Sequence, residues 1–174
     1  NDAARELTVQ GDTAITGTDG VSVRIDNNNG LVRFLGQTQI SQRLLGGIAI
    51  TNSAGGVQFG GTAGDIATIL NDLAAPSQSA AILATNNSAN IVFGGATVDN
   101  AQGNLPGGAG VHLRNNTGDI NFGTLDIISL DGVGLFGFNN TSITIRGGDI
   151  LTDNQAAVNI EQSGIDIALE SVTS

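Results

Sequence analysis

Several residue types are missing or nearly missing from this chain of 174 residues. It contains no cysteine, methionine, tryptophan or tyrosine, and only two prolines. Without cysteine, no disulfide framework can hold the fold, and cysteine usage does not decide the redox compartment. Without tryptophan and tyrosine, the chain lacks the aromatic side chains that would best stack on sugar rings, because its only aromatic residues are six phenylalanines.

Basic residues are also scarce. Lysine is absent, and six arginines face 16 acidic residues, which gives a net charge of −10. A nucleic-acid backbone needs a basic track, so we exclude nucleic acid as a partner. The acidic charge attracts divalent cations and suits an extracellular setting. No run of eighteen apolar residues occurs, so we expect no membrane-spanning helix.

The residues that are abundant favour short strands joined by tight turns. Valine, isoleucine, leucine and alanine supply the apolar side chains, and 26 glycines accompany many asparagines. A hydrophobic content of 40% is sufficient for one continuous core. We therefore treat residues 1–174 as a single domain.

A repeat runs through the sequence. An apolar-x-apolar pair is followed by an asparagine-containing turn and then by an apolar-x-Phe pair. The four copies with equal spacing are Val23-Arg24-Ile25 to Val32-Arg33-Phe34, Ile48-Ala49-Ile50 to Val57-Gln58-Phe59, Ile82-Leu83-Ala84 to Ile91-Val92-Phe93, and Val111-His112-Leu113 to Ile120-Asn121-Phe122. Two further copies have a shorter turn, in which the last residue of the first pair lies five residues before the first residue of the second pair. They are Phe136-Gly137-Phe138 to Ile143-Thr144-Ile145 and Val158-Asn159-Ile160 to Ile165-Asp166-Ile167.

A third apolar position follows each second pair, five residues later. It falls at Val98, Ile127, Ile150 and Val172, and Ile40 is one place out of register. Alternation with a period of two leaves one face of each strand to be buried, which a single coil cannot do alone. We therefore predict an all-β fold, a right-handed parallel β-helix (β-solenoid) of about six to seven coils, each with three short strands.

Stacked coils place equivalent residues on top of one another, about 4.8 Å apart. Two internal stacks follow from this spacing. One is an aromatic stack of Phe34, Phe59, Phe93 and Phe122, and the other is an asparagine ladder in the turns. The ladder members are Asn27 or Asn28, Asn52, Asn86 or Asn87, Asn115 or Asn116, and Asn139 or Asn140.

This repeat resembles the right-handed parallel β-helix repeats of bacterial surface proteins and adhesins, such as autotransporter passenger domains, and of the wider pectate-lyase-like superfamily. The resemblance runs from Leu7 to Val172. It implies an extracellular or cell-surface location and a structural or adhesive role.

The outward positions do not favour catalysis. On the second strand they run Thr8, Arg33, Gln58, Val92, Asn121, Thr144 and Asp166, without clustered acids. We expect no enzyme activity, no catalytic residues and no cofactor. Asp126 and Asp149 fall at equivalent positions on adjacent coils, so they are weak candidates for Ca²⁺ ligands. His112, the only histidine, is expected to be a surface residue.

Residues Leu7-Thr8-Val9 and Ala14-Ile15 look like the second and third strands of a coil without its first strand, and Val172 lies on a third strand. Neither end shows a capping segment, and open parallel edges recruit further strands. We expect an extracellular structural or adhesive solenoid that associates with itself head to tail as a fibre subunit or forms part of a long surface stalk. The alternative is a β-helix that binds or cleaves an extracellular polysaccharide through Asp126 and Asp149.

Overall fold

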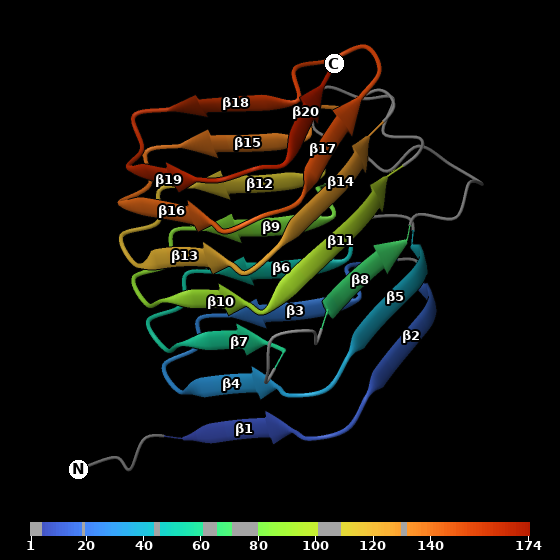
Figure 1. The fold of residues 1–174 in the computed structure, drawn as a ribbon. Helices are drawn as coiled ribbons and strands as arrows, with labels where there is room; N and C mark the ends of the chain where they lie inside the picture. The colour runs from blue at the N-terminus through green and yellow to red at the C-terminus, as the bar shows by residue number, and fades with distance from the viewer. Residues whose placement is uncertain are drawn as a thin grey trace.

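The computed structural model is a right-handed parallel β-solenoid (Figure 1). It describes residues 5–18, 20–43, 46–60, 66–70, 80–100, 109–129 and 132–174. Within these ranges all regular secondary structure is β-strand, and every strand pairing is parallel. Each full coil adds one strand to each of three sheets, so the predicted all-β parallel solenoid is confirmed.

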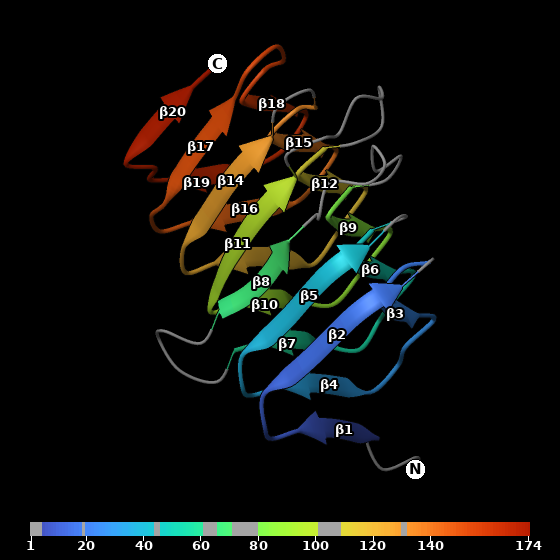
Figure 2. The same ribbon diagram turned by 90° about the vertical axis from the view of Figure 1, so that its right-hand side faces the viewer.

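Sheets A and B have seven strands each, and sheet C has six. Sheet A consists of β1 (Glu6–Val9), β4 (Leu31–Phe34), β7 (Val57–Phe59), β10 (Ile91–Phe93), β13 (Asp119–Phe122), β16 (Ser142–Ile145) and β19 (Ile165–Ile167). Sheet B consists of β2 (Thr13–Thr18), β5 (Thr38–Arg43), β8 (Ile66–Leu70), β11 (Gly95–Asn100), β14 (Leu125–Ser129), β17 (Asp149–Thr152) and β20 (Ser171–Thr173). Sheet C consists of β3 (Val23–Asp26), β6 (Ile48–Thr51), β9 (Ile82–Thr85), β12 (Val111–Arg114), β15 (Leu135–Phe138) and β18 (Val158–Glu161). Figure 2 shows sheet B as a broad staircase of strands along one side.

The core is built from columns of equivalent side chains. In sheet A the rings of Phe34, Phe59, Phe93 and Phe122 stack with centroids 4.8 to 5.1 Å apart and planes within 6° of parallel. Phe59, Phe93 and Phe122 are at most 1% exposed. The predicted aromatic stack is therefore confirmed, and it fixes the register of four consecutive coils.

The register of the third strand differs from the prediction at one place. Ile40 pairs with Ile15 on one side and with Ile69 on the other, and Ile69 pairs with Val98. Ile40 is thus in register with the third column and is fully buried, so the expectation that it lies one place out was wrong. The extra residue between Phe34 and Ile40 is taken up in the corner before β5, because the ladder of hydrogen bonds sets which residues pair.

The first strand of the fifth repeat, β15, also differs. Leu135 and Gly137 pair with the inward Val111 and Leu113, so Phe136 and Phe138 point outward. The prediction that Phe136 and Phe138 point inward was wrong. The last inward residue of this strand is Gly137, which lies six residues before Ile143, the first inward residue of the next strand. At Gly137 even a Cβ would lie 3.0 Å from Ile143 Cδ1 and 3.2 Å from Ile160 Cγ1. The isoleucines of the upper coils fill this part of the core, so no phenylalanine fits there.

Candidate functional site

Asp126 and Asp149 lie side by side on the outer face of sheet B, as the repeat predicted. The backbone N–H of Asp149 donates to Asp126 Oδ1 at 3.0 Å, and the Ser171 hydroxyl donates to Asp149 Oδ1 at 2.6 Å. One oxygen of each carboxylate is therefore used in a hydrogen-bonded column along the axis. Across the described ranges, no group of three or more His, Cys, Asp or Glu side chains could hold a metal ion. Two carboxylates are fewer ligands than Ca²⁺ takes, so Ca²⁺ binding stays a prediction.

The outward row of sheet A has the predicted register from Thr8 to Asp166. Its charged members are engaged locally. Arg33 Nη1 lies 3.0 Å from Glu6 Oε1, and Arg146 Nη1 lies 3.3 Å from Asp166 Oδ2. The row thus mixes exposed ion pairs with neutral side chains, an arrangement of small energetic weight.

The asparagine turns contain two ladders with different surroundings. The inner ladder runs through Ser53, Asn87, Asn116, Asn140 and Ser163, of which the first four are buried and Ser163 is half-buried. Asn116 Oδ1 accepts from the backbone N–H of Asn87 at 3.0 Å and from Asn87 Nδ2 at 2.9 Å. Asn116 Nδ2 donates to Asn140 Oδ1 at 2.8 Å and to the Ala84 carbonyl at 3.0 Å. The predicted ladder is therefore present, with serine at two of its positions.

The outer ladder lies one residue earlier in each turn. Its members all have positive φ: Asn27, Asn52, Asn86, Asn115, Asn139 and Gln162, with φ between 50° and 58°. Asparagine tolerates this left-handed conformation better than most residues. The side-chain amides bond along the axis, as between Asn139 Nδ2 and Asn115 Oδ1 at 3.0 Å. Backbone conformation therefore explains the outer asparagines as well as the ladder does.

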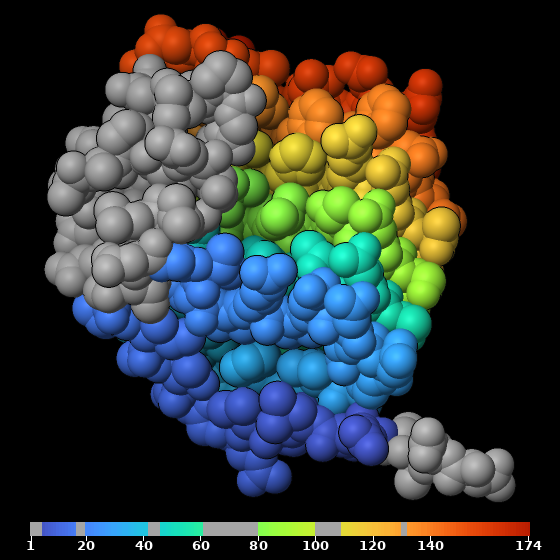
Figure 3. Space-filling model, turned by 180° about the vertical axis from the view of Figure 1, so that it is seen from behind, coloured from blue at the N-terminus to red at the C-terminus, as the bar shows by residue number. Residues whose placement is uncertain are grey.

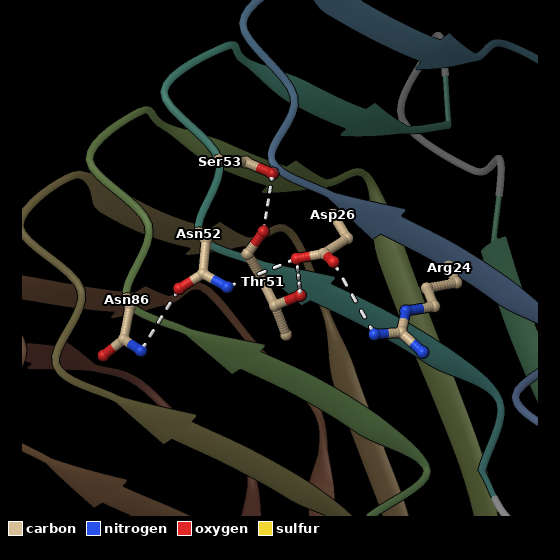
Figure 4. Close-up of polar contacts among 6 residues, drawn as sticks. All are labelled: Arg24, Asp26, Thr51, Asn52, Ser53 and Asn86. Atoms are coloured by element: carbon tan, nitrogen blue, oxygen red, sulfur yellow. Dashed lines mark hydrogen bonds and ion pairs between the residues drawn. The ribbon is translucent and has the colours of Figure 1, made fainter.

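Asp26 continues the outer ladder (Figure 4). Its carboxylate accepts from the Thr51 hydroxyl at 2.7 Å and from Asn52 Nδ2 at 3.2 Å, and Arg24 Nη2 lies 3.6 Å away. The hydrogen bonds from Thr51 and Asn52 hold the pKa of Asp26 below its usual value, and Arg24 adds to this effect. Asp26, Asn52 and Arg24 are exposed, so these hydrogen bonds and this ion pair are surface contacts.

His112 lies on the outer face of sheet C, half-buried rather than simply exposed. Its ring meets the Phe136 ring edge-on, with centroids 4.7 Å apart. Burial lowers the pKa of His112, and the nearby charge of Arg114 lowers it further. Both effects favour the neutral imidazole.

Arg114 lies beside His112 on β12, with its guanidinium carbon 5.8 Å from the centroid of the Phe138 ring. We call His112, Arg114, Phe136 and Phe138 the β12–β15 cluster. The apolar alternation alone does not predict this cluster, because it places both phenylalanines in the core. Aligning Asn139-Asn140 with Asn115-Asn116, instead of aligning the apolar pairs, would have placed Phe138 opposite Arg114.

The two end coils expose members of the apolar columns. Leu7 is 57% exposed at one end, and Ile165 and Val172 are 61% and 53% exposed at the other. Beside Leu7, a groove of about 700 Å³ runs along the edge of sheet C, lined by Val23, Ile25, Val32 and Phe34 together with polar residues of the Asp26–Gly30 turn. This groove lies where sheet C is one strand shorter than sheets A and B.

Comparison with known proteins gave no match: no family model, no curated protein and no solved structure matches this chain. In the part of the chain that the structure describes, no helix is long and apolar enough to cross a membrane.

Proposed function

We propose that this protein is an extracellular structural or adhesive β-solenoid whose coils continue beyond its own ends. The continuation is either a second copy stacked head to tail in a fibre or the adjoining coils of a long surface stalk. The observation that carries this proposal is the exposure of Leu7, Ile165 and Val172, three members of otherwise buried columns.

The columns match from end to end. In sheet A one column begins at Leu7 and ends at Ile165, and a second begins at Val9 and ends at Ile167. In sheet B a column begins at Ile15 and ends at Val172. A further coil of the same type would cover each exposed apolar side chain with another one. Burying each is worth about 1.5–3 kcal/mol.

The strand edges at the ends support the same proposal. In parallel sheets an edge strand presents unpaired backbone N–H and C=O groups, which recruit a further strand. The groove beside β3 has apolar side chains on its floor and follows the edge of sheet C. In the stalk form, a sheet C strand of an adjoining coil would complete the sheet in this groove, whereas a head-to-tail copy that stacks β19 on β1 would leave the groove open.

The surface supports the extracellular and adhesive part of the proposal. The chain is strongly acidic, with a net charge of −10. Its repeat resembles those of bacterial surface proteins, and its stacked core gives a stiff rod with varied outward side chains. These features are typical of a spacer or a stalk.

Electron microscopy and sedimentation velocity of the purified protein test the proposal. We expect rods longer than one solenoid, or assemblies that grow with protein concentration. Leu7→Asp should abolish this growth, because it places a charge in the end contact. Thr8→Asp, an outward change on the same strand, is the matched control and should leave the assemblies intact.

Monodisperse monomers at every concentration would reject the fibre form. The stalk form has its own test, a tandem fusion of two copies. Continuous columns across the junction should raise the melting temperature above that of the single chain. An unchanged melting temperature would reject the stalk form.

The adjacency of Asp126 and Asp149 favours one second candidate, a β-helix that binds or cleaves a polysaccharide. Two neighbouring carboxylates are the groups that acid/base cleavage of glycosidic bonds uses. Replacing both with asparagine should abolish cleavage or binding of an acidic or neutral polymer while the circular dichroism spectrum is unchanged. Equal behaviour of the variant and the original chain would reject this candidate.

A further inference from the structure

The outer face of sheet C has an unusual composition for this molecule. Its two outward phenylalanines, Phe136 and Phe138, are the only ones outside the internal stack. They lie with His112 and Arg114 in the β12–β15 cluster. Figure 3 views the molecule from the side on which sheet C lies, and the yellow and orange segments that contain the cluster form part of that surface.

Two outward charges flank Phe138. One outward column of sheet C contains Arg114 on β12, Phe138 on β15 and Glu161 on β18, in that order. Arg114 and Glu161 are exposed. Among the described side chains neither forms an ion pair, whereas Arg24, Arg33 and Arg146 each do.

Arg114 and Glu161 do not pair with each other because Phe138 lies between them. Each charge is one coil from Phe138, so their strands are roughly 10 Å apart at the usual strand spacing. The neighbouring outward column repeats this plan with neutral groups, since His112 and Asn159 flank Phe136. The surface therefore has an apolar centre on β15 and complementary polar groups at equal distances on either side.

We infer that this face binds the same face of a second copy of the chain, related by a two-fold axis that runs parallel to β15 between the two sheets. That operation reverses the solenoid axis and keeps the position along the strand. It places Phe136 on Phe136 and Phe138 on Phe138, Arg114 opposite Glu161 of the second copy, and Glu161 opposite its Arg114. His112 then faces Asn159, and a neutral imidazole can accept or donate a hydrogen bond there.

Charge complementarity argues for a second copy over another occupant. A two-fold contact requires that a patch be complementary to itself, so that residue i meets residue j and j meets i. Opposite charges at equal distances from an apolar centre meet that requirement. An unrelated acidic partner would account for Arg114 but would leave Glu161 facing like charge.

The inference goes beyond end-to-end stacking because it uses the side of the solenoid and none of the end residues. Its product is an antiparallel pair of solenoids. If the chains also stack end to end, the resulting fibre is a paired one without overall polarity.

Charge reversal tests the inference in sedimentation equilibrium of the Leu7→Asp variant, in which end contacts are blocked. Arg114→Glu and Glu161→Arg, made separately, each place like charges opposite one another. Each should raise the dissociation constant of the dimer at least about tenfold. The double variant exchanges the two charges and should return the dissociation constant to within about threefold of the parent. Arg146→Glu, which changes an exposed arginine on another face, should have no effect.

Cross-linking tests the orientation, and the absence of cysteine makes single introduced thiols unambiguous. We expect a mixture of His112→Cys and Asn159→Cys chains to be joined by a bis-maleimide reagent that spans about 10 Å, the usual distance between facing sheets. Either variant alone should cross-link less. A strict monomer, unequal behaviour of the double reversal and the parent, or equal cross-linking in all three samples would overturn the inference. If the original chain forms dimers but no long assemblies, only the end-to-end proposal is overturned.

Discussion

Two adjacent asparagines in the same turn, Asn115 and Asn116, have different roles. Asn116 is 1% exposed, and its side-chain amide makes four hydrogen bonds to the two neighbouring coils. Asn115 is half-buried and has a positive φ of 53°. The comparison shows that one ladder is held by buried hydrogen bonds, whereas the other is required by backbone conformation.

The residues that replace asparagine in other coils agree with this division. The inner position holds Ser53 and Ser163. The Ser163 hydroxyl accepts from the Asn140 backbone N–H of the neighbouring coil, and the Ser53 hydroxyl donates to the Thr51 carbonyl of its own turn. The outer position holds Gln162, which keeps the positive φ. Hydrogen-bonding capacity is thus kept inside the turn, and the left-handed conformation is kept outside it.

Removal of an inner amide should have the largest effect on the free energy of unfolding. Asn116→Ala removes, in a buried site, the acceptor of the Asn87 backbone N–H and the side-chain donor to the Ala84 carbonyl. Asn140 Oδ1 keeps its bond from the backbone N–H of residue 116, and Asn87 Nδ2 keeps its bond to the Ile50 carbonyl. Each unsatisfied buried group costs about 1–3 kcal/mol, so we expect a loss of about 3 kcal/mol or more in the free energy of unfolding. Urea denaturation monitored by circular dichroism measures this loss.

Asn116→Ser is the matched control for the inner ladder because serine occupies the same position in two other coils. It should destabilise the fold less than alanine does. An alanine variant as stable as the serine variant would show that the inner amides contribute no net stability.

Changes at the outer position should act through the backbone. Asn115→Ala places a residue that disfavours the left-handed region at φ 53°, which costs about 1 kcal/mol. Asn115→Gly should be close to neutral because glycine adopts this φ readily. Unfolding free energies of the two variants decide the point, and a glycine variant as unstable as the alanine variant would attribute the effect to the lost side-chain amide.

The sequence was sufficient to predict the parts of the fold that repeat. The equal offsets gave the coil, the stack from Phe34 to Phe122 and the adjacency of Asp126 and Asp149. These predictions succeeded because parallel stacking puts equivalent positions in contact, so a pattern along the chain becomes a pattern along the axis.

Where the repeat is irregular, the sequence pattern predicted the wrong residues for the core. At β15 two large apolar residues flank a glycine, and the alternation alone favours burying the phenylalanines. The structure buries Leu135 and Gly137 instead, because the side chains of Ile143 and Ile160 occupy the core beside Gly137. Side-chain volume in the neighbouring coils decided the register, and this information is not local to the strand. The β12–β15 cluster was missed for the same reason.

The smallest expected effect concerns the pKa of Asp26 at the end of the outer ladder. Thr51→Val removes the hydroxyl that donates to its carboxylate, so the pKa of Asp26 should rise towards its usual value. Because the folded pKa is lowered, this carboxylate adds stability above the usual aspartate pKa, and that contribution is lost as the pH falls through the folded value. The variant should therefore show a weaker dependence of stability on pH in this acidic range.

Carboxyl chemical shifts in an NMR titration measure the Asp26 pKa directly. Thr85→Val changes the equivalent threonine on β9, which pairs with Thr51 and not with Asp26. It should leave the Asp26 titration unchanged. If both variants shift the Asp26 pKa equally, the cause is the packing of the whole outer column and not the hydrogen bond from Thr51. The outer ladder would then resemble the inner ladder more closely than its exposure suggests.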